Sequence, residues 1–226
     1  MMKSALLALC IGVSAASASM ILGLGVEADY YVPVASGDFS YTNNSGTTQT
    51  HFNKESESTY QVGVYFEHPV PLIPNFRLDL TPEGSFSGSD GFLGTNKVSV
   101  SQTDITPYYE ILDNVVDLDV GVTFKVLDIK VEGTINQNVT ETIPMGYVAA
   151  GVDIPGTGLR IAGDVKHIYY KGDSFTDARI KAVIDFPAGL QAQGGYRYES
   201  LKISDHYDMN ADVKFQGPFI GLGYTF

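Results

Sequence analysis

The chain has 226 residues, of which 44% are hydrophobic and 18% charged, and its mean hydropathy is +0.02. Its 14 basic and 26 acidic residues give a net charge of -12, which argues against nucleic acid as a partner. The single cysteine, Cys10, excludes disulfides and cysteine-ligated metals from the rest of the chain. The composition also includes 24 Gly, 14 Tyr and 12 Phe.

The first segment, residues 1–18, has the pattern of a cleaved signal peptide. Lys3 supplies a positive charge, a short apolar run follows, and Ala16-Ser17-Ala18 forms a small-x-small cleavage site. The run is too short to cross a bilayer as a helix, which needs about 20 residues. We therefore expect export, with residues 19–226 as the mature chain. A lipoprotein site at Cys10 is the poorer alternative, because Leu9 before it is bulky.

From residue 19 onward apolar and polar residues alternate with a period of two, which predicts β-strands. In residues 116–126 every even position is apolar. The alternation changes phase at Leu127, which suggests a β-bulge there. The predicted strands are, in chain order, 21–33, 59–68, 75–86, 98–112, 115–132, 144–154, 159–171, 176–186, 190–203 and 211–226.

The connections between these strands alternate between short turns rich in Pro and Gly and longer polar loops. The loops cover 35–58, 85–97, 133–142, 172–175 and 204–210. Membrane barrels have short periplasmic turns and longer external loops. The pattern therefore predicts a single ten-stranded antiparallel barrel with both termini in the periplasm. Gly172 could instead form a tight turn, and a miscounted hairpin would leave eight or twelve strands.

Alternation alone does not separate a membrane barrel from a secreted soluble β-sandwich, which stays as the alternative. Two features favour the barrel, whose apolar face meets lipid. Aromatic residues gather at the ends of the apolar stripes, as interfacial girdles do: Tyr30, Tyr60, Phe66, Tyr169, Phe186, Tyr198, Tyr224 and Phe226. The chain also ends on an alternating pattern that is typical of the assembly signal of outer-membrane barrels: Pro218, Ile220, Leu222, Tyr224 and Phe226.

Several turn motifs resemble a poorly characterised family of Gram-negative outer-membrane β-barrel proteins. They are residues 67–75 (EHPVPLIPN), 108–114 (YYEILDN), 155–159 (PGTGL) and the ending at 217–222. The resemblance covers essentially the whole mature chain. It implies an integral outer-membrane barrel of unassigned function, and it brings no catalytic or ligand residues. The first and last loops depart from the family pattern, which leaves a function carried by these loops open.

The lumen-facing phase collects thirteen acids and seven bases. The acids are Glu27, Asp29, Glu67, Asp79, Glu83, Asp104, Glu110, Asp117, Asp119, Asp153, Asp164, Asp185 and Glu199. The bases are Arg77, Lys125, Arg160, Lys166, Arg179, Lys181 and Arg197. Because isolated buried charges are costly, these groups must pair. The leading hypothesis is a structural or interaction barrel with a salt-bridged lumen. The alternative is a narrow cation-preferring channel, since six acids would lack a base.

A hydrolase site at the rim is a minor alternative. His68 and His167 fall on the lipid-facing phase without a convincing catalytic partner. His206 lies in the last loop beside Asp205 and Asp208, which are also weak metal candidates lacking the spacing of a calcium loop. We expect no enzyme activity and no cofactor. The expected partners are outer-membrane lipids, lipopolysaccharide and the barrel-assembly machinery, and the expected state is a monomer.

Overall fold

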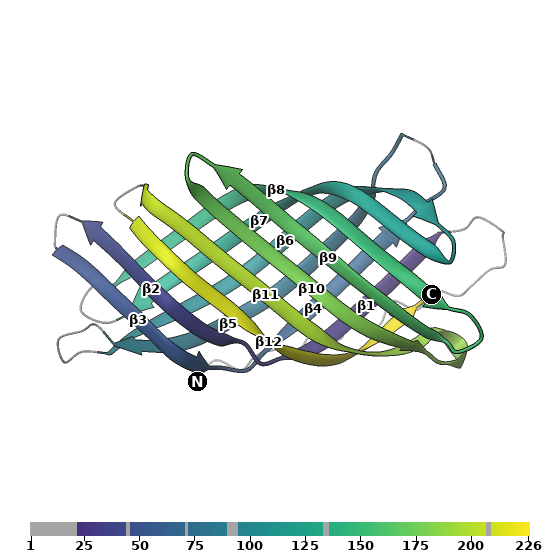
Figure 1. Ribbon diagram of the computed structural model, residues 1–226, viewed down its shortest axis with the longest axis horizontal. Coiled ribbons are helices and arrows are strands. Elements are labelled where there is room, and N and C mark those ends of the chain that lie inside the picture. The colour runs from purple at the N-terminus through teal and green to yellow at the C-terminus, as the bar shows by residue number, and fades with distance from the viewer. Residues whose placement is uncertain (1–21, 44–45, 71, 90–94, 133–135, 207–208) are drawn as a thin grey trace.

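A computed structural model describes residues 22–43, 46–70, 72–89, 95–132, 136–206 and 209–226. The predicted signal peptide, residues 1–18, lies outside the described residues. The structure is an all-β, antiparallel barrel, as predicted (Figure 1). Its strands are β1 (Gly23–Tyr31), β2 (Val34–Asn43), β3 (Gly46–Ser56), β4 (Thr59–Glu67), β5 (Asn75–Ser89), β6 (Thr95–Asp113), β7 (Val116–Glu132), β8 (Gln137–Ile154), β9 (Leu159–Tyr170), β10 (Asp173–Asp185), β11 (Leu190–His206) and β12 (Met209–Thr225).

The barrel closes because β1 pairs with both β12 and β4. Gly25 lies opposite Thr225 in one ladder, and Val26 lies opposite Val64 in the other. The ring therefore contains the ten predicted strands, namely β1 and β4 to β12, while β2 and β3 are additional. A closed ring has no open sheet edge, so a soluble β-sandwich is excluded.

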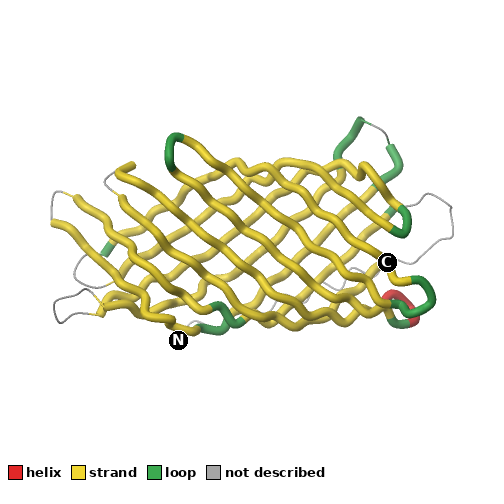
Figure 2. Tube along the Cα trace, in the orientation of Figure 1, coloured by secondary structure: helices red, strands yellow, loops and turns green. Residues whose placement is uncertain are grey.

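The two ends of the barrel differ. One end, called here the turn end, carries the four short connections from β4 to β5, β6 to β7, β8 to β9 and β10 to β11, with the short helix η1 (Pro187–Gly189) in the last (Figure 2). The other, the loop end, carries the connections from β2 to β3, β5 to β6, β7 to β8, β9 to β10 and β11 to β12. No helix among the described residues is long and apolar enough to cross a membrane.

The predicted first loop, 35–58, is wrong: most of it forms the hairpin β2–β3. Pro33 ends β1 because it has no N–H to donate, and the chain then pairs again, with β2 bonded to β12. Its content of Ser, Thr and Asn suggested a loop. The inward positions Ala35, Phe39 and Phe52 are nevertheless buried, which gives the hairpin an apolar inner face. The hairpin extends the barrel at the loop end (Figure 1).

Other connections are also shorter than predicted. β5 and β6 extend into the predicted loop 85–97, and β8 begins at Gln137, inside the predicted loop 133–142. Between β9 and β10 only Lys171 and Gly172 intervene, with positive φ angles of 50° and 100°. Positive φ at both central residues is the requirement of a tight type I′ hairpin. The tight turn still joins antiparallel strands, so the predicted strand count of the ring is confirmed.

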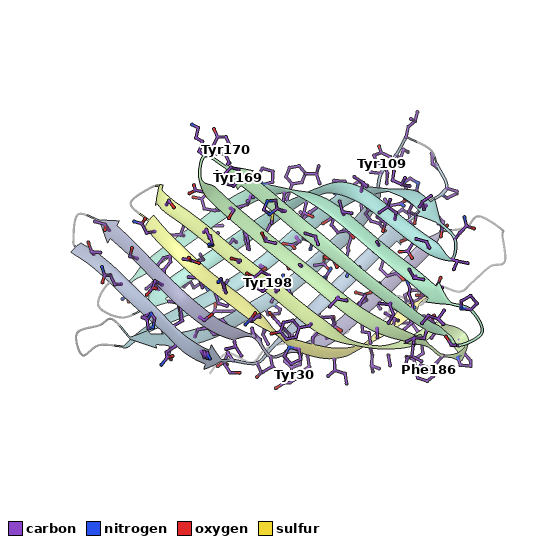
Figure 3. All side chains as sticks on the ribbon, viewed as in Figure 1. Tyr30, Tyr109, Tyr169, Tyr170, Phe186 and Tyr198 are labelled. Atoms are coloured by element: carbon purple, nitrogen blue, oxygen red, sulfur yellow. The ribbon has the colours of Figure 1, made fainter. Side chains whose placement is uncertain are left out.

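A band of exposed apolar residues surrounds the barrel. Every ring strand contributes to it, for example through Val26, Val62, Leu78, Ile105, Val122, Val152, Val165, Ile180, Tyr196 and Leu222. Aromatic side chains such as Tyr30, Tyr169 and Phe186 project from the wall (Figure 3). Such a surface suits the hydrocarbon interior of a bilayer and its two interfaces. We therefore treat the ring as membrane-spanning.

Along β7 the outer and inner faces exchange character without any bulge. Its register with β8 is continuous from Val116 to Val131, so the bulge predicted at Leu127 is wrong. Lys125 and Leu127 both point inward and are buried, whereas Phe124 and Lys130 point outward. On the turn-end side of this level, the barrel therefore has a lipid-facing outer surface and a charged interior. On the loop-end side, it has a polar outer surface and an apolar interior.

A bulge does occur in β5, where the register with β6 shifts between Thr81 and Gly84. Pro82, which cannot donate to a ladder, and Glu83 lie within this irregularity. As a consequence, Glu83 points outward and is exposed, although it was predicted to face the lumen. Glu83 and Lys130 pair at 2.8 Å on the outer surface. The hydrogen bond between them lowers the pKa of Glu83 and raises that of Lys130.

Candidate functional site: the closed lumen

Lys125 occupies the centre of the charged part of the lumen. It comes from β7, and none of its surface is exposed. Its Nζ lies 2.9 Å from the carboxylates of both Asp104 and Asp177 and donates to Gln102 Oε1 at 2.9 Å. These contacts satisfy all three donors of the ammonium group. A strictly alternating strand forms here because the even positions face lipid and the odd positions face this interior.

From Asp104 the network continues toward β1 and β5. Lys166 on β9 contacts Asp104 at 2.6 Å and Asp79 at 3.1 Å. Asp79 in turn pairs with Arg77 at 2.9 Å, and Arg77 pairs with Glu27 at 2.7 Å. The network therefore crosses the lumen from β7 to β1.

From Glu27 and Asp79 the network also reaches β10. Lys181 contacts Glu27 at 2.6 Å, and Arg179 lies 3.5 Å from Asp79 and 2.9 Å from Asp164. The chain of ion pairs is thus continuous between opposite walls of the barrel.

On the other side of Lys125, Asp177 pairs with Arg197 of β11 at 2.7 Å. Arg197 also lies 3.2 Å from Glu199 and donates from Nη2 to Gln102 at 3.1 Å. The whole network holds as many acids as bases. The acids are Glu27, Asp79, Asp104, Asp164, Asp177 and Glu199, and the bases are Arg77, Lys125, Lys166, Arg179, Lys181 and Arg197.

This neutral balance matters because each charge of the network then has a partner of opposite charge at short distance. A buried ion pair repays its desolvation only when its geometry is good and its remaining lone pairs are satisfied. Here Asp79, Asp104 and Asp177 each contact at least two bases. The side chains fill the lumen at this level, as they do in narrow barrels.

The sequence did not assign Asp177 to the lumen, although it contacts two bases of the network. The signal was available, because Asp177 shares the alternation phase of Arg179 and Lys181 on β10. Asp29, another predicted lumen acid, is buried and accepts a hydrogen bond from Gln193 at 2.6 Å.

The remaining predicted lumen residues lie nearer the turn end and outside the network. Asp117 pairs with Arg160 at 2.6 Å, and Asp185 accepts a hydrogen bond from Gln191 at 2.8 Å. Glu110 and Asp153 are exposed. The other two, Glu67 and Asp119, line a cavity of about 150 Å³ between the network and the turn end.

Toward the loop end the lumen is filled by apolar side chains. Phe39 and Phe52 of the hairpin β2–β3 pack with Phe86, and partly buried Phe215 lies 5.1 Å from Phe86 between ring centroids. Leu127, Met145 and Phe175 form an adjoining cluster. The cavity left among these side chains is only about 30 Å³. This apolar core was not predicted, because alternation indicated a lumen that is charged throughout.

The histidines do not form a catalytic group among the described side chains. His68 and His167 are bonded to Pro74 and Thr176, respectively. His51 on β3 pairs with Asp38 on β2 at 2.8 Å, on the exposed outer face of the hairpin. The side chains of Asp205, His206 and Asp208 lie outside the described part of the structure, so the rim site stays a prediction.

The predicted assembly signal lies on the outward phase of β12. Pro218, Ile220, Leu222, Tyr224 and Phe226 are all exposed. The rings of Tyr224 and Phe226 pack edge to face with centroids 4.7 Å apart. The pattern therefore belongs to the lipid-facing band at the turn end.

No family model matches the chain, and no curated protein matches its sequence. The resemblance drawn from the turn motifs therefore stays a prediction. Among solved structures, the chain is similar to the translocator domain of the autotransporter NalP from Neisseria meningitidis, with 15% identity over 90% of this chain and 88% of that one and a TM-score of 0.47. It is also similar to the outer membrane protease OmpT from Escherichia coli, with 11% identity over 89% and 97% and a TM-score of 0.42. A third is Neisserial surface protein A, with 11% identity over 90% and 97% and a TM-score of 0.38.

Proposed function

We propose that this protein is an integral outer-membrane barrel of a Gram-negative bacterium whose lumen is closed, and that its role is structural or in interaction rather than in conduction. The single observation that carries the proposal is Lys125, which is fully buried in mid-lumen and bonded to Asp104, Asp177 and Gln102. An ion crossing the barrel would have to break these bonds and leave buried carboxylates unpaired, which is costly.

A second barrier supports the same proposal. The apolar cluster around Phe39, Phe52 and Phe86 fills the lumen at the loop end. A bare ion would lose its hydration among these side chains without gaining a polar partner. A permeating ion therefore meets two obstacles of opposite chemistry in series.

The location and orientation belong to the proposal as well. The apolar band, the predicted signal peptide and the terminal pattern ending in Phe226 support outer-membrane insertion through the barrel-assembly machinery. In this orientation both termini and the turn end face the periplasm. The polar loop end then faces lipopolysaccharide and the outside of the cell. We propose a monomer, because the ring closes within one chain.

The cation channel is the less favoured alternative. It depended on a surplus of lumen acids, but the acids of the central network are matched by bases. Of the acids with no base among the described side chains, Glu67, Glu110 and Asp119 lie nearer the turn end, where they could attract cations without passing them. Asp29 is buried and bonded to Gln193. The rim hydrolase has less support, because the exposed pair of His51 and Asp38 has no nucleophile bonded to it among the described side chains.

Conductance in planar bilayers tests the proposal. We expect the refolded protein to insert without producing current steps, and Asp119→Asn to behave in the same way. Reproducible cation-selective steps in the wild type, with selectivity reduced by Asp119→Asn, would contradict the closed lumen and support the channel. Heat-modifiable migration on gels confirms in each case that the tested protein is folded.

A further inference from the structure

A polar cavity of about 150 Å³ lies in the lumen between the central ion-pair network and the turn end. Its inner wall is the network itself, through Glu27, Arg77 and Lys181. Because Arg77 and Lys181 are both bonded to Glu27, these side chains close the cavity on that side. Its other walls come from strands β4 and β6 to β11, so nine strands of the ring contribute to it.

The cavity carries more negative than positive charge once its ion pairs are assigned. Arg77 and Lys181 contact Glu27, and Arg160 contacts Asp117. The bases that line the cavity are therefore all engaged. Glu67 and Asp119 are left without a basic partner among the described side chains, although Glu67 accepts a hydrogen bond from the hydroxyl of Tyr108 at 2.8 Å.

Aromatic rings form much of the remaining lining. Tyr108 and Tyr147 are almost fully buried, and their rings pack edge to face with centroids 6.1 Å apart. Tyr65 lies across β1, where it bonds to Thr225 at 3.0 Å. This position requires Gly25, because a Cβ there would lie 2.0 Å from the Tyr65 ring. The fold thus brings three tyrosine rings beside two unpaired carboxylates.

From this combination we propose that the cavity binds a small aliphatic diamine. Carboxylates pair with ammonium groups through charge-assisted hydrogen bonds, and tyrosine faces attract cations. Two unpaired carboxylates, Glu67 and Asp119, match the two charges of a diammonium chain. An engineered apolar cavity of about 150 Å³ holds benzene, so a ligand of roughly six non-hydrogen atoms fits this volume. The inference rests on the proposed closed lumen, since the network forms the end wall.

Equilibrium dialysis of the refolded full-length mature chain against labelled 1,4-diaminobutane tests the proposal. We expect saturable binding of one diamine per chain. Asp119→Asn and Glu67→Gln should each weaken binding about tenfold, as expected for loss of one charge-assisted contact. Asp153→Asn removes an exposed acid of the same end and should leave the affinity unchanged. The uncharged 1,4-butanediol, of the same length, should not compete.

The aromatic contribution has its own test. Tyr147→Leu should weaken binding about threefold or more, and Tyr147→Phe, which keeps the ring, should restore most of it. Absence of saturable binding would overturn the proposal. So would an equal loss in Asp153→Asn, or competition by Mg²⁺ at the same concentration as the diamine, since either result would indicate general attraction of cations. Conductance steps would contradict the closed lumen separately, because dialysis measures binding whether or not ions pass.

Discussion

Buried charges of the lumen show how single residues determine what this barrel can do. Lys125 has lost all contact with solvent, yet each of its donors has an acceptor. Its partners Asp104 and Asp177 are shared with Lys166 and Arg197, so neither of these two carboxylates depends on one base. Sharing of this kind makes the network tolerant of small displacements. It also makes removal of the central base a direct test of how much the network stabilises the fold.

We expect Lys125→Met to lower the free energy of unfolding by about 3 kcal/mol, because it leaves two buried carboxylates short of a base. Urea unfolding of the protein in lipid vesicles measures this loss. Lys130→Met is the matched control, since Lys130 is on the same strand but pairs with Glu83 on the exposed surface. We expect no measurable change for the control. Similar unfolding curves for the two variants would contradict a stabilising role of the network.

A second prediction concerns the close approach of β6 and β7. A Cβ at Gly121 would lie 2.3 Å from the carbonyl oxygen of Pro107 and 2.8 Å from Cα of Tyr108. Gly121→Ala should therefore force the two backbones apart and destabilise the barrel by about 1–3 kcal/mol. At Gly146, on the neighbouring strand, the nearest atom would be 3.6 Å away. Gly146→Ala should be tolerated, and a larger loss at Gly146 than at Gly121 would refute the packing argument.

At the scale of the element, β7 shows what alternation can and cannot predict. The period of two gave the strands of the ring and most of their ends, because each face of a barrel wall has one environment at a given depth. It could not distinguish a bulge from a change of environment along one straight strand. The apparent phase change at Leu127 was of the second kind. The change of pattern at Leu127 marks the level at which the two faces exchange polarity. The continuous register with β8 was needed to recognise it as such.

This exchange can be mapped by cysteine labelling on intact cells. In a background with Cys10 replaced, Asp128→Cys and Lys130→Cys should react with a membrane-impermeant maleimide, because both point outward beyond the apolar band. Leu127→Cys should be protected by the inner core and Val122→Cys by lipid. Labelling of Leu127→Cys at the rate of its neighbour Asp128→Cys would contradict the continuous register. Absence of labelling at both outward positions would instead reverse the proposed orientation.

The wrong and missing assignments elsewhere have related physical causes. Residues 35–58 lacked the apolar stripe of a lipid-facing strand, because β2 and β3 face an aqueous exterior and only their inner positions are apolar. The phase of the alternation was sufficient to predict which charged residues face the lumen. Their partners were not, since ion pairs such as Lys125 with Asp177 join strands far apart in sequence. Asp177 lies inside the predicted strand 176–186 and on its inward phase, so alternation alone was sufficient to place it in the lumen.

At the scale of the whole molecule, the strands close into a ring at two levels, and β5 to β12 belong to both rings. In the membrane, β1 and β4 close the ring; toward the loop end, β2 pairs with β12 and β3 approaches β5 at His51 and Ser89. The charged network lies within the first ring and the apolar core within the second. Each closure therefore depends on a different part of the chain. The hairpin β2–β3 should thus be separable from the membrane-spanning ring.

Deletion of residues 34–56 tests this separation. The N–H of Glu57 donates to the carbonyl of Pro33 at 3.2 Å, so a two-residue Asn-Gly turn can join the two positions. Because the ladders of β1 with β4 and β12 remain, we expect the variant to fold, as shown by heat-modifiable migration on gels. We also expect no current steps in planar bilayers. Loss of Phe39 and Phe52 from the apolar core should nevertheless lower the free energy of unfolding, by about 3–5 kcal/mol for each phenylalanine side chain.

Removal of residues 42–47 alone is the control for this deletion, since it shortens the tip of the hairpin and leaves both phenylalanines in the core. Its unfolding midpoint should stay near that of the wild type. If the full deletion prevented folding, the hairpin would be part of the ring itself. Current steps in a folded deletion variant would show that the apolar core, rather than the ion pairs around Lys125, is the barrier that closes the lumen. Absence of current steps would indicate that the ion pairs close the lumen, because they are the barrier that remains after the deletion.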